Sequence, residues 1–252
     1  MGERTSYEPG TFSWAELVTS DSAAAKAFYT ALFGWQTEDT PIPGDGVYTM
    51  ANIDGKTVAA MYEASDQPPH WNSYVTVANV DESASRTSEL GATLLAEPFD
   101  VMEVGRMAFL QDPTGAALAL WQPRAHIGAG LVNAHGALSW NELATPDPEA
   151  AKTFYAALFG WEYQPFQEGY WVIQNAGRAN GGLREQMEGE KGMPAYWLVY
   201  FGASDTDEAV EKAGANGGGV LAPAMDLPMG RIAVLRDGQG AVFAVYAGQM
   251  ED

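Results

Sequence analysis

FSWAELVTSDSAAAKAFYTALFGW, at residues 12–35, is repeated as LSWNELATPDPEAAKTFYAALFGW at residues 138–161. Trp14 therefore corresponds to Trp140, and Glu16 to Glu142. Further along, GRMAFLQDPTGAALALW (105–121) is repeated as GRIAVLRDGQGAVFAVY (230–246). A repeat that covers most of a chain indicates duplicated structural units. We therefore predict two domains, residues 1–126 and residues 127–252.

Each half contains the same order of elements twice. A strand over residues 13–19 leads into a helix that Asp21 caps and Gly34 ends. Three short strands follow, and the pattern then restarts with a strand at Trp71. The sequence therefore predicts an α+β fold of four βαβββ modules in tandem, two in each half.

The composition excludes several classes of function. The chain has 252 residues, a formal net charge of −20, no Cys and three His. Without Cys there is no disulfide framework, Cys-ligated zinc or thiol nucleophile. The acidic balance argues against nucleic acid and anionic membranes as partners. The N-terminal MGERTSYEPG has no apolar signal region, and no apolar run approaches the ~18 residues of a membrane span. We expect a cytoplasmic chain.

These motifs carry a family resemblance. The strand, the S/T-x-D helix start, FYxxLFGW and the DPTG-type turn before the last strand resemble the vicinal oxygen chelate superfamily. That superfamily includes glyoxalases, bleomycin-resistance proteins and extradiol dioxygenases, and this chain is most similar to two-domain actinobacterial members described as hydroxylase-like or glyoxalase-like. The resemblance covers roughly residues 12–122 and 137–247. It implies that the modules pair and that their sheets curl into two cups, each holding a ligand or metal ion.

The resemblance also implies where metal ligands would lie. Metal-dependent members carry a His on the first strand, a second ligand on the strand that restarts the pattern, and a Glu after the DPTG-type turn. The corresponding positions here are Trp14, Asn72 and Ala119 in the first half, and Trp140, Leu198 and Ala244 in the second. A remaining carboxylate would lie near Met61 in the first half and Leu183 in the second, with Glu63 and Glu185 as the nearby alternatives. Because Trp, Leu and Ala do not coordinate a divalent ion at ~2.0–2.2 Å, we expect no metal and no other cofactor.

Strand alternation places both repeated glutamates inside the cups, beside the tryptophans. The predicted ligand-binding residues are Trp14, Glu16, Met61, Asn72, Tyr74, Ala119 and Trp121 in the first half, and Trp140, Glu142, Leu198, Tyr200, Ala244 and Tyr246 in the second. Aromatic walls with one carboxylate suit a flat apolar ligand that carries an amine or hydroxyl. Alternatively, the tryptophans fill the cups as solid cores and the glutamates are hydrogen-bonded structural groups.

Other polar residues are assigned structural roles. His70 shares the cup side of its strand with Asn72, whereas His126 and His135 are placed in the linker, apart from the cups. Arg106 and Arg231 are expected to neutralise an inner glutamate, and the alternative is that they bind the substrate.

Three functions remain open. The first is a metal-free binding protein for a small aromatic or cationic metabolite or antibiotic, acting in sequestration or resistance or as an auxiliary to a pathway oxygenase. The second is a metal-independent tailoring enzyme, a hydroxylase, cyclase or isomerase, with Glu16 or Glu142 as general base. The third is a metal-dependent glyoxalase or dioxygenase. Because four modules already supply both cups, we expect a monomer or a weak homodimer.

Overall fold

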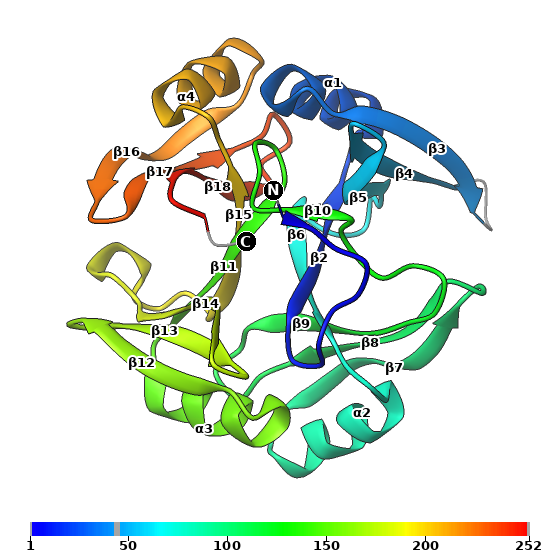
Figure 1. The fold of residues 1–252 in the computed structure, drawn as a ribbon, viewed down its shortest axis with the longest axis vertical. Coiled ribbons are helices and arrows are strands. Elements are labelled where there is room, and N and C mark those ends of the chain that lie inside the picture. Colours follow the sequence, from blue (N-terminus) through cyan, green and yellow to red (C-terminus); the bar gives the residue numbers. More distant parts are fainter. Residues whose placement is uncertain (1, 43–45, 251–252) are drawn as a thin grey trace.

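A computed structural model describes residues 2–42 and 46–250. Within these ranges the chain forms two mixed β-sheets, each flanked by α-helices (Figure 1). The elements of the first half are β2 (Phe12–Thr19), α1 (Ser22–Phe33), β3 (Gln36–Ile42), β4 (Gly46–Ile53), β5 (Lys56–Glu63), β6 (His70–Thr76), α2 (Val80–Glu89), β7 (Thr93–Val101), β8 (Gly105–Gln111) and β9 (Ala117–Pro123).

The second half repeats this order. Its elements are β11 (Leu138–Thr145), α3 (Pro148–Phe159), β12 (Glu162–Gln167), β13 (Tyr170–Asn175), β14 (Arg178–Glu185), the short 3₁₀ helix η1 (Glu188–Glu190), β15 (Tyr196–Gly202), α4 (Thr206–Ala215), β16 (Gly219–Leu227), β17 (Gly230–Arg236) and β18 (Val242–Gly248). Two short strands, β1 (Gly2–Glu3) and β10 (Leu131–Val132), pair with each other, and β10 also pairs with β11. Gly2 and Glu3 therefore extend the sheet of the second half.

The two sheets have the same topology. The first runs β3-β4-β5-β2-β6-β9-β8-β7, and the second runs β12-β13-β14-β11-β15-β18-β17-β16. In each sheet the first strands of two modules, β2 with β6 and β11 with β15, pair antiparallel at the centre. The prediction of an α+β fold with four βαβββ modules is confirmed, and the modules pair within each half.

The repeated helix has the predicted ends. The Asp21 carboxylate accepts a hydrogen bond from the Ala24 backbone N–H at 2.9 Å, and Gly34 ends α1 at a φ of 74°. Only glycine adopts this left-handed conformation without steric cost. The equivalent helix α3 has the Asp147 cap, Pro148 in its first turn, and Gly160 at a φ of 77°.

The repeated FY and Asp-containing turn motifs meet across the halves. The Tyr29 hydroxyl donates to Asp237 at 3.1 Å, and the Tyr155 hydroxyl donates to Asp112 at 2.9 Å. Asp112 also accepts from the backbone N–H of Ala116, which closes its own hairpin turn. Helix α1 accordingly lies beside α4, and α2 beside α3 (Figure 1). A Tyr–Asp hydrogen bond therefore joins the two halves at each junction.

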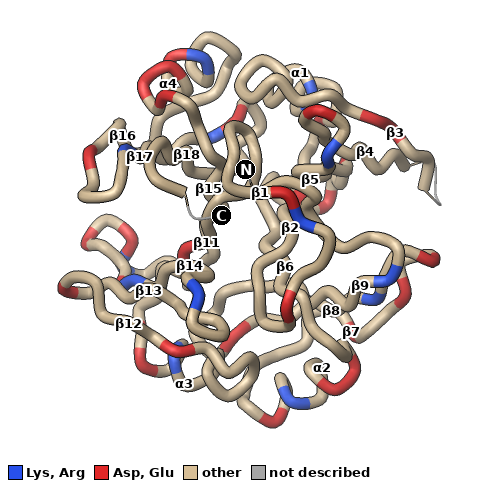
Figure 2. The backbone as a smooth tube through the Cα atoms, in the orientation of Figure 1, with Lys and Arg blue, Asp and Glu red and all other residues tan. Residues whose placement is uncertain are grey.

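The charge is spread over both halves. Figure 2 shows acidic residues around the whole perimeter of the chain rather than at one end or on one element. Among the described residues, no helix is long and apolar enough to cross a membrane.

Candidate functional site

The strand register defines which residues share a side of each sheet. Paired residues on neighbouring strands point to the same side. Glu16 is paired with Asn72 on β6 and Ala60 on β5, and Trp14 is paired with Tyr74. We call this side of the first sheet the first cup face. The equivalent side of the second sheet, around Glu142, is the second cup face. The opposite side of each sheet packs against the helices.

One predicted residue lies on the wrong side. Met61 is paired with Leu17 and is fully buried on the helix side of the first sheet. The cup-face residues of β5 are instead Ala60 and Tyr62, so the prediction for this strand was one residue out of register. Because side chains alternate, a shift of one residue moves a side chain to the opposite face. Leu183 likewise pairs with Leu143, on the helix side of the second sheet.

Glu16 is held by two tyrosines. Both the Tyr48 and the Tyr74 hydroxyl donate to its carboxylate at 2.7 Å. The Glu16 side chain is buried, and this burial raises its pKa above the ordinary value, although the two hydrogen bonds and nearby His70 act in the opposite direction. His70 lies on the first cup face, as predicted, because it is paired with Val18. No cation is hydrogen-bonded to Glu16 among the described residues.

The linker covers the first cup face. The His126 ring packs edge-on against Trp14, with ring centroids 4.6 Å apart, and also against Trp121 at 5.8 Å. Trp121 Nε1 donates to the His126 backbone carbonyl at 2.9 Å. Only 3% of Trp14 and 5% of Trp121 remain exposed, and burial lowers the pKa of His126 to about 4. The prediction that His126 lies apart from the cups was wrong: it packs over Trp14 and Trp121 on the first cup face.

Glu142 has a different partner. Arg184 Nε donates to its carboxylate at 2.8 Å, and the guanidinium also binds both oxygens of Glu190, at 2.6 and 2.7 Å. The Tyr196 hydroxyl contacts both Arg184 and Glu190. The hydrogen bonds from Arg184 lower the pKa of Glu190 to about 2. We call Glu142, Arg184, Glu190 and Tyr196 the arginine cluster.

Arg106 and Arg231 do not neutralise an inner glutamate, contrary to expectation. Arg106 pairs with Asp81 and Asp100, and Arg231 with Asp207 and Asp226, all near the surface. The buried partner of a cup glutamate is Arg184. Arg184 lies two residues after Gly182, which is paired with Glu142, and Tyr62 lies two residues after Ala60, which is paired with Glu16. Arg184 and Tyr62 therefore occupy equivalent positions on the two cup faces.

The apolar part of the second cup face is only partly buried. Leu198, Tyr200 and Ala244 form its buried floor, and the residues packed around them remain partly exposed: Trp140, Tyr196, Ile232, Val234 and Tyr246. Further out on the same side lie Phe166, against the Tyr170 ring at 6.1 Å, and Met225, which is paired with Ile232. Both are exposed. The second cup face therefore presents aromatic and aliphatic side chains to a possible ligand.

Gly182 allows two of these aromatic groups to approach the sheet. A Cβ atom at Gly182 would lie 2.2 Å from the Tyr170 hydroxyl oxygen and 3.0 Å from Trp140 Nε1. The corresponding residue of the first half is Ala60. Trp140 Nε1 donates to the Tyr170 hydroxyl at 3.3 Å above this glycine.

The side chains at the ligand positions that the resemblance implies do not fit a chelated divalent ion. These positions hold Trp14, Asn72 and Ala119 in the first half and Trp140, Leu198 and Ala244 in the second. Across residues 2–42 and 46–250, no group of three or more His, Asp or Glu is placed to hold a metal. The indole, amide and alkyl groups present do not make the donor set of a stable site.

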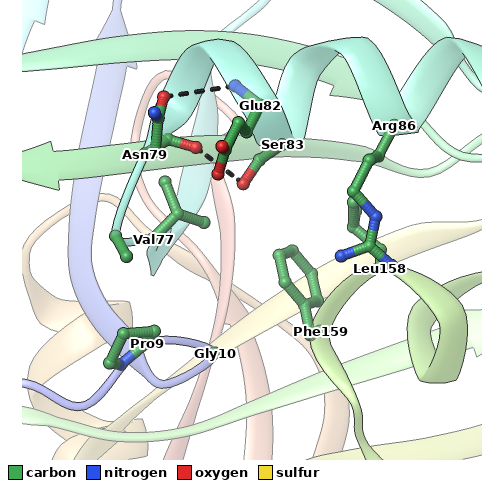
Figure 3. Close-up of a pocket in the computed structure, with 10 residues that line it drawn as sticks. Pro9, Gly10, Val77, Asn79, Glu82, Ser83, Arg86, Leu158 and Phe159 are labelled. Atoms are coloured by element: carbon green, nitrogen blue, oxygen red, sulfur yellow. Dashed lines mark hydrogen bonds between the residues drawn. The ribbon is translucent and has the colours of Figure 1, made fainter.

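A groove of about 210 Å³ lies elsewhere, where α2 meets α3 (Figure 3). It is lined by Pro9 and Gly10, by the start of α2 at Asn79, and by Arg86 and Phe159. It includes none of the predicted site residues. Its main polar groups already have partners, since Asn79 caps α2 and Arg86 donates to the Ala157 carbonyl. The groove therefore carries less chemistry than the cup faces.

Six polar residues at the two sites were not predicted from the sequence. They are Tyr48, Tyr62, Tyr170, Arg184, Glu190 and Tyr196. A usable signal was present: the two halves match with an offset of 122 over strands β4–β5 and β13–β14, as Tyr48 and Tyr170 show. This offset aligns Tyr62 with Arg184.

The comparisons with known proteins agree with this fold. The family model described as Glyoxalase/Bleomycin resistance protein/Dioxygenase superfamily matches residues 11–120 and 137–245. "Putative glyoxylase CFP32" of Mycobacterium tuberculosis is 43% identical over 97% of both chains. "Anthracycline biosynthesis protein DauV" of Streptomyces sp. (strain C5) is 35% identical over 96% of this chain and 94% of that protein.

Solved structures show the same fold at low identity. The Mn(II)-bound glyoxalase from Novosphingobium aromaticivorans has a TM-score of 0.68 at 14% identity, covering 100% of this chain and 85% of that one. The 2,3-dioxygenase LapB from Pseudomonas sp. KL28 has a TM-score of 0.66 at 13% identity, covering 98% and 96%. With both halves matched by the family model and a relative at 43% identity over nearly the full length, the chain belongs to the glyoxalase/bleomycin resistance protein/dioxygenase superfamily.

Proposed function

We propose that the chain is a metal-free binding protein for a flat aromatic small molecule, and that it binds this ligand at the second cup face. The observation that carries the proposal is the contrast between the faces. Trp14 and Trp121 are buried under the linker, whereas Trp140 and Tyr246 remain partly exposed around an apolar floor. Partly exposed aromatic rings above buried aliphatic groups suit a stacked ligand.

The second-half residues have distinct roles in this proposal. Trp140 and Tyr246 contact the faces or edges of the ligand rings, and Leu198, Tyr200 and Ala244 form the surface beneath. Glu142 does not pair directly with an amine, because its carboxylate is already hydrogen-bonded to Arg184. In the first half, Trp14, Glu16, Tyr74, Ala119 and Trp121 act as core residues.

The curated relatives support an aromatic ligand. Two of them are named anthracycline biosynthesis proteins, DauV and DnrV, the latter from Streptomyces peucetius at 33% identity over 96% of this chain. Anthracyclines are planar, multi-ring compounds, which match the chemistry of the second cup face. On this proposal the chain sequesters such a compound or presents it to a pathway oxygenase.

The test is a titration of tryptophan fluorescence with an anthracycline and with its sugar-free aglycone, which lacks the amine. The expected result is saturable quenching at micromolar ligand, with similar affinities for both compounds, since Glu142 is occupied by Arg184. Quenching by neither compound would contradict the proposal. Strong preference for the amine-bearing compound would restore Glu142 as a direct ligand contact.

One observation favours a second candidate, a metal-independent tailoring enzyme. The pKa of Glu16 is raised by burial, and a raised carboxyl pKa is useful in general acid–base catalysis. Against it, both Glu16 oxygens accept tyrosine hydroxyls and the linker covers the surrounding face. A turnover assay distinguishes the two candidates. Formation of product in excess of the protein concentration, together with its loss in the Glu16→Gln variant, would establish the enzyme.

A further inference from the structure

The second half has a longer loop beside its cup face. The connection between β14 and β15 covers residues 186–195, whereas the corresponding connection between β5 and β6 covers only residues 64–69. The extra residues include η1 and place Glu190 in the arginine cluster. The loop and Arg184 therefore occur together in the second half, while the first half has a short loop and Tyr62.

The loop is closed by its own hydrogen bonds. Gln186 Nε2 donates to the Met193 and Pro194 carbonyls at 3.2 and 3.1 Å. The Met187 backbone N–H donates to Glu190 at 2.7 Å. Glu190 thus both caps η1 and binds Arg184. The same carboxylate fixes the internal shape of the loop and its attachment to the second cup face.

Two methionines on this loop are open to solvent. Met187 is 62% exposed and Met193 is 51% exposed. More than half of each side chain is therefore available to a partner, and methionine adapts its shape to apolar partners. Phe166 and Met225, also exposed, extend the second cup face outward on β12 and β16.

We propose that residues 186–195 form a specificity-determining wall of the second cup face, with Glu190 as its positioning residue. Met187 and Met193 contact the outer rings of a ligand whose inner rings lie on Trp140 and Tyr246. A three-ring compound is held by the floor alone, whereas a ligand of four or more rings also reaches the methionines. This inference rests on the proposed function and adds the feature that selects ligand size.

The test compares Glu190→Gln with Glu188→Gln. Glu188 is a matched control on the same loop, because its one ion-pair partner in residues 2–42 and 46–250 is the exposed Lys191. The probes are anthraquinone, with three rings, and a four-ring anthracycline aglycone. We expect Glu190→Gln to weaken aglycone binding about tenfold, which corresponds to ~1.4 kcal/mol. Anthraquinone binding should be unchanged, and Glu188→Gln should behave as wild type with both probes.

Two further measurements separate a positioning role from general damage to the fold. The double variant Met187→Ala, Met193→Ala changes only exposed side chains and should lower aglycone affinity without changing the unfolding midpoint. In the wild-type protein, the ¹³C methyl resonances of Met187 and Met193 should shift with the aglycone and not with anthraquinone. These results would support a role of residues 186–195 in selecting ligand size.

The outcomes distinguish this inference from the proposed function. If wild-type protein binds both probes and Glu190→Gln matches Glu188→Gln, the loop has no selective role and the inference fails while the binding function stands. Unmoved methyl resonances with bound aglycone would overturn it in the same way. If neither probe binds wild-type protein, the proposed function fails as well.

Discussion

Each cup face has a glutamate at the same position of its central strand, but the groups that surround it differ. In the first half, Glu16 takes two tyrosine hydroxyls and the linker packs His126 over Trp14. In the second, Glu142 takes a guanidinium, and Trp140 remains partly exposed. The two copies thus share their inner positions, but the tryptophans of the first cup face are buried whereas Trp140 is partly exposed. This difference is the reason that we propose the second copy as the ligand-binding one.

The largest expected effect is the difference between replacing Trp14 and replacing the equivalent Trp140. Trp14→Ala removes a nearly fully buried ring and should destabilise the protein by about 3–5 kcal/mol. Trp140→Ala removes a partly exposed ring, so it should cost less stability but abolish aromatic-ligand binding. Urea denaturation and fluorescence titration measure the two effects. Equal losses of stability in the two variants, or loss of ligand binding only in Trp14→Ala, would contradict the different roles assigned to Trp14 and Trp140.

The next effect concerns the residue that distinguishes the two glutamates. Arg184→Met leaves the Glu142 charge buried without its ion-pair partner, and such a change typically costs about 3 kcal/mol or more. Tyr62→Phe, at the equivalent position of the first sheet, should cost under ~1 kcal/mol. Both are measured as free energies of unfolding in urea at pH 7. A similar small loss for both would show that the arginine cluster has little energetic importance.

The contributions of Glu16 and Glu190 to the free energy of unfolding should change with pH in opposite directions. Burial raises the pKa of Glu16 above 4.5, so the native state holds this proton to higher pH than the unfolded chain. Its effect on stability therefore becomes less favourable as pH rises above about 4.5. The pKa of Glu190 is lowered to about 2, so its stabilising effect is fully present above about 4.5 and is lost as pH falls towards 2.

The measurement is the free energy of unfolding of wild type, Glu16→Gln and Glu190→Gln between pH 2 and pH 7. The advantage of wild type over Glu190→Gln should shrink as pH falls below about 4.5. Relative to Glu16→Gln, wild type should lose stability as pH rises. Parallel profiles for the two pairs would contradict the opposite environments assigned to these carboxyl groups.

The smallest expected effect comes from the ligand's charge. Because Arg184 occupies the Glu142 carboxylate, Glu142→Gln should change the affinities for an anthracycline and its aglycone by the same factor. Titrations of both ligands against this variant provide the check. A selective loss of the amine-bearing compound would mean that Glu142 contacts the amine.

Much of the fold followed from short-range signals. The helix ends at Asp21 and Gly34, the repeated FYxxLFGW stretch and the alternation around Trp14 and Glu16 all describe neighbouring residues, and these predictions match the structure. Met61 was misplaced because register depends on the exact length of the preceding hairpin. A one-residue error there reverses the face.

The polar partners of the two glutamates depended on longer-range geometry. Arg184 and Glu190 come to Glu142 only through the pairing of β14 with β11 and through the longer loop 186–195. The first half has no sequence counterpart for that loop, so the repeat gave no guide to it. His126 was misjudged for a related reason, since nothing in the linker sequence shows that it folds back over Trp14.

The number and place of bound ligands test the central claim most directly. Titration calorimetry with an anthracycline aglycone should give one molecule per chain. Trp14→Phe should retain this binding, and Trp140→Ala should abolish it. Two molecules per chain, or undiminished binding in Trp140→Ala, would contradict a filled first cup face and a ligand-binding second one.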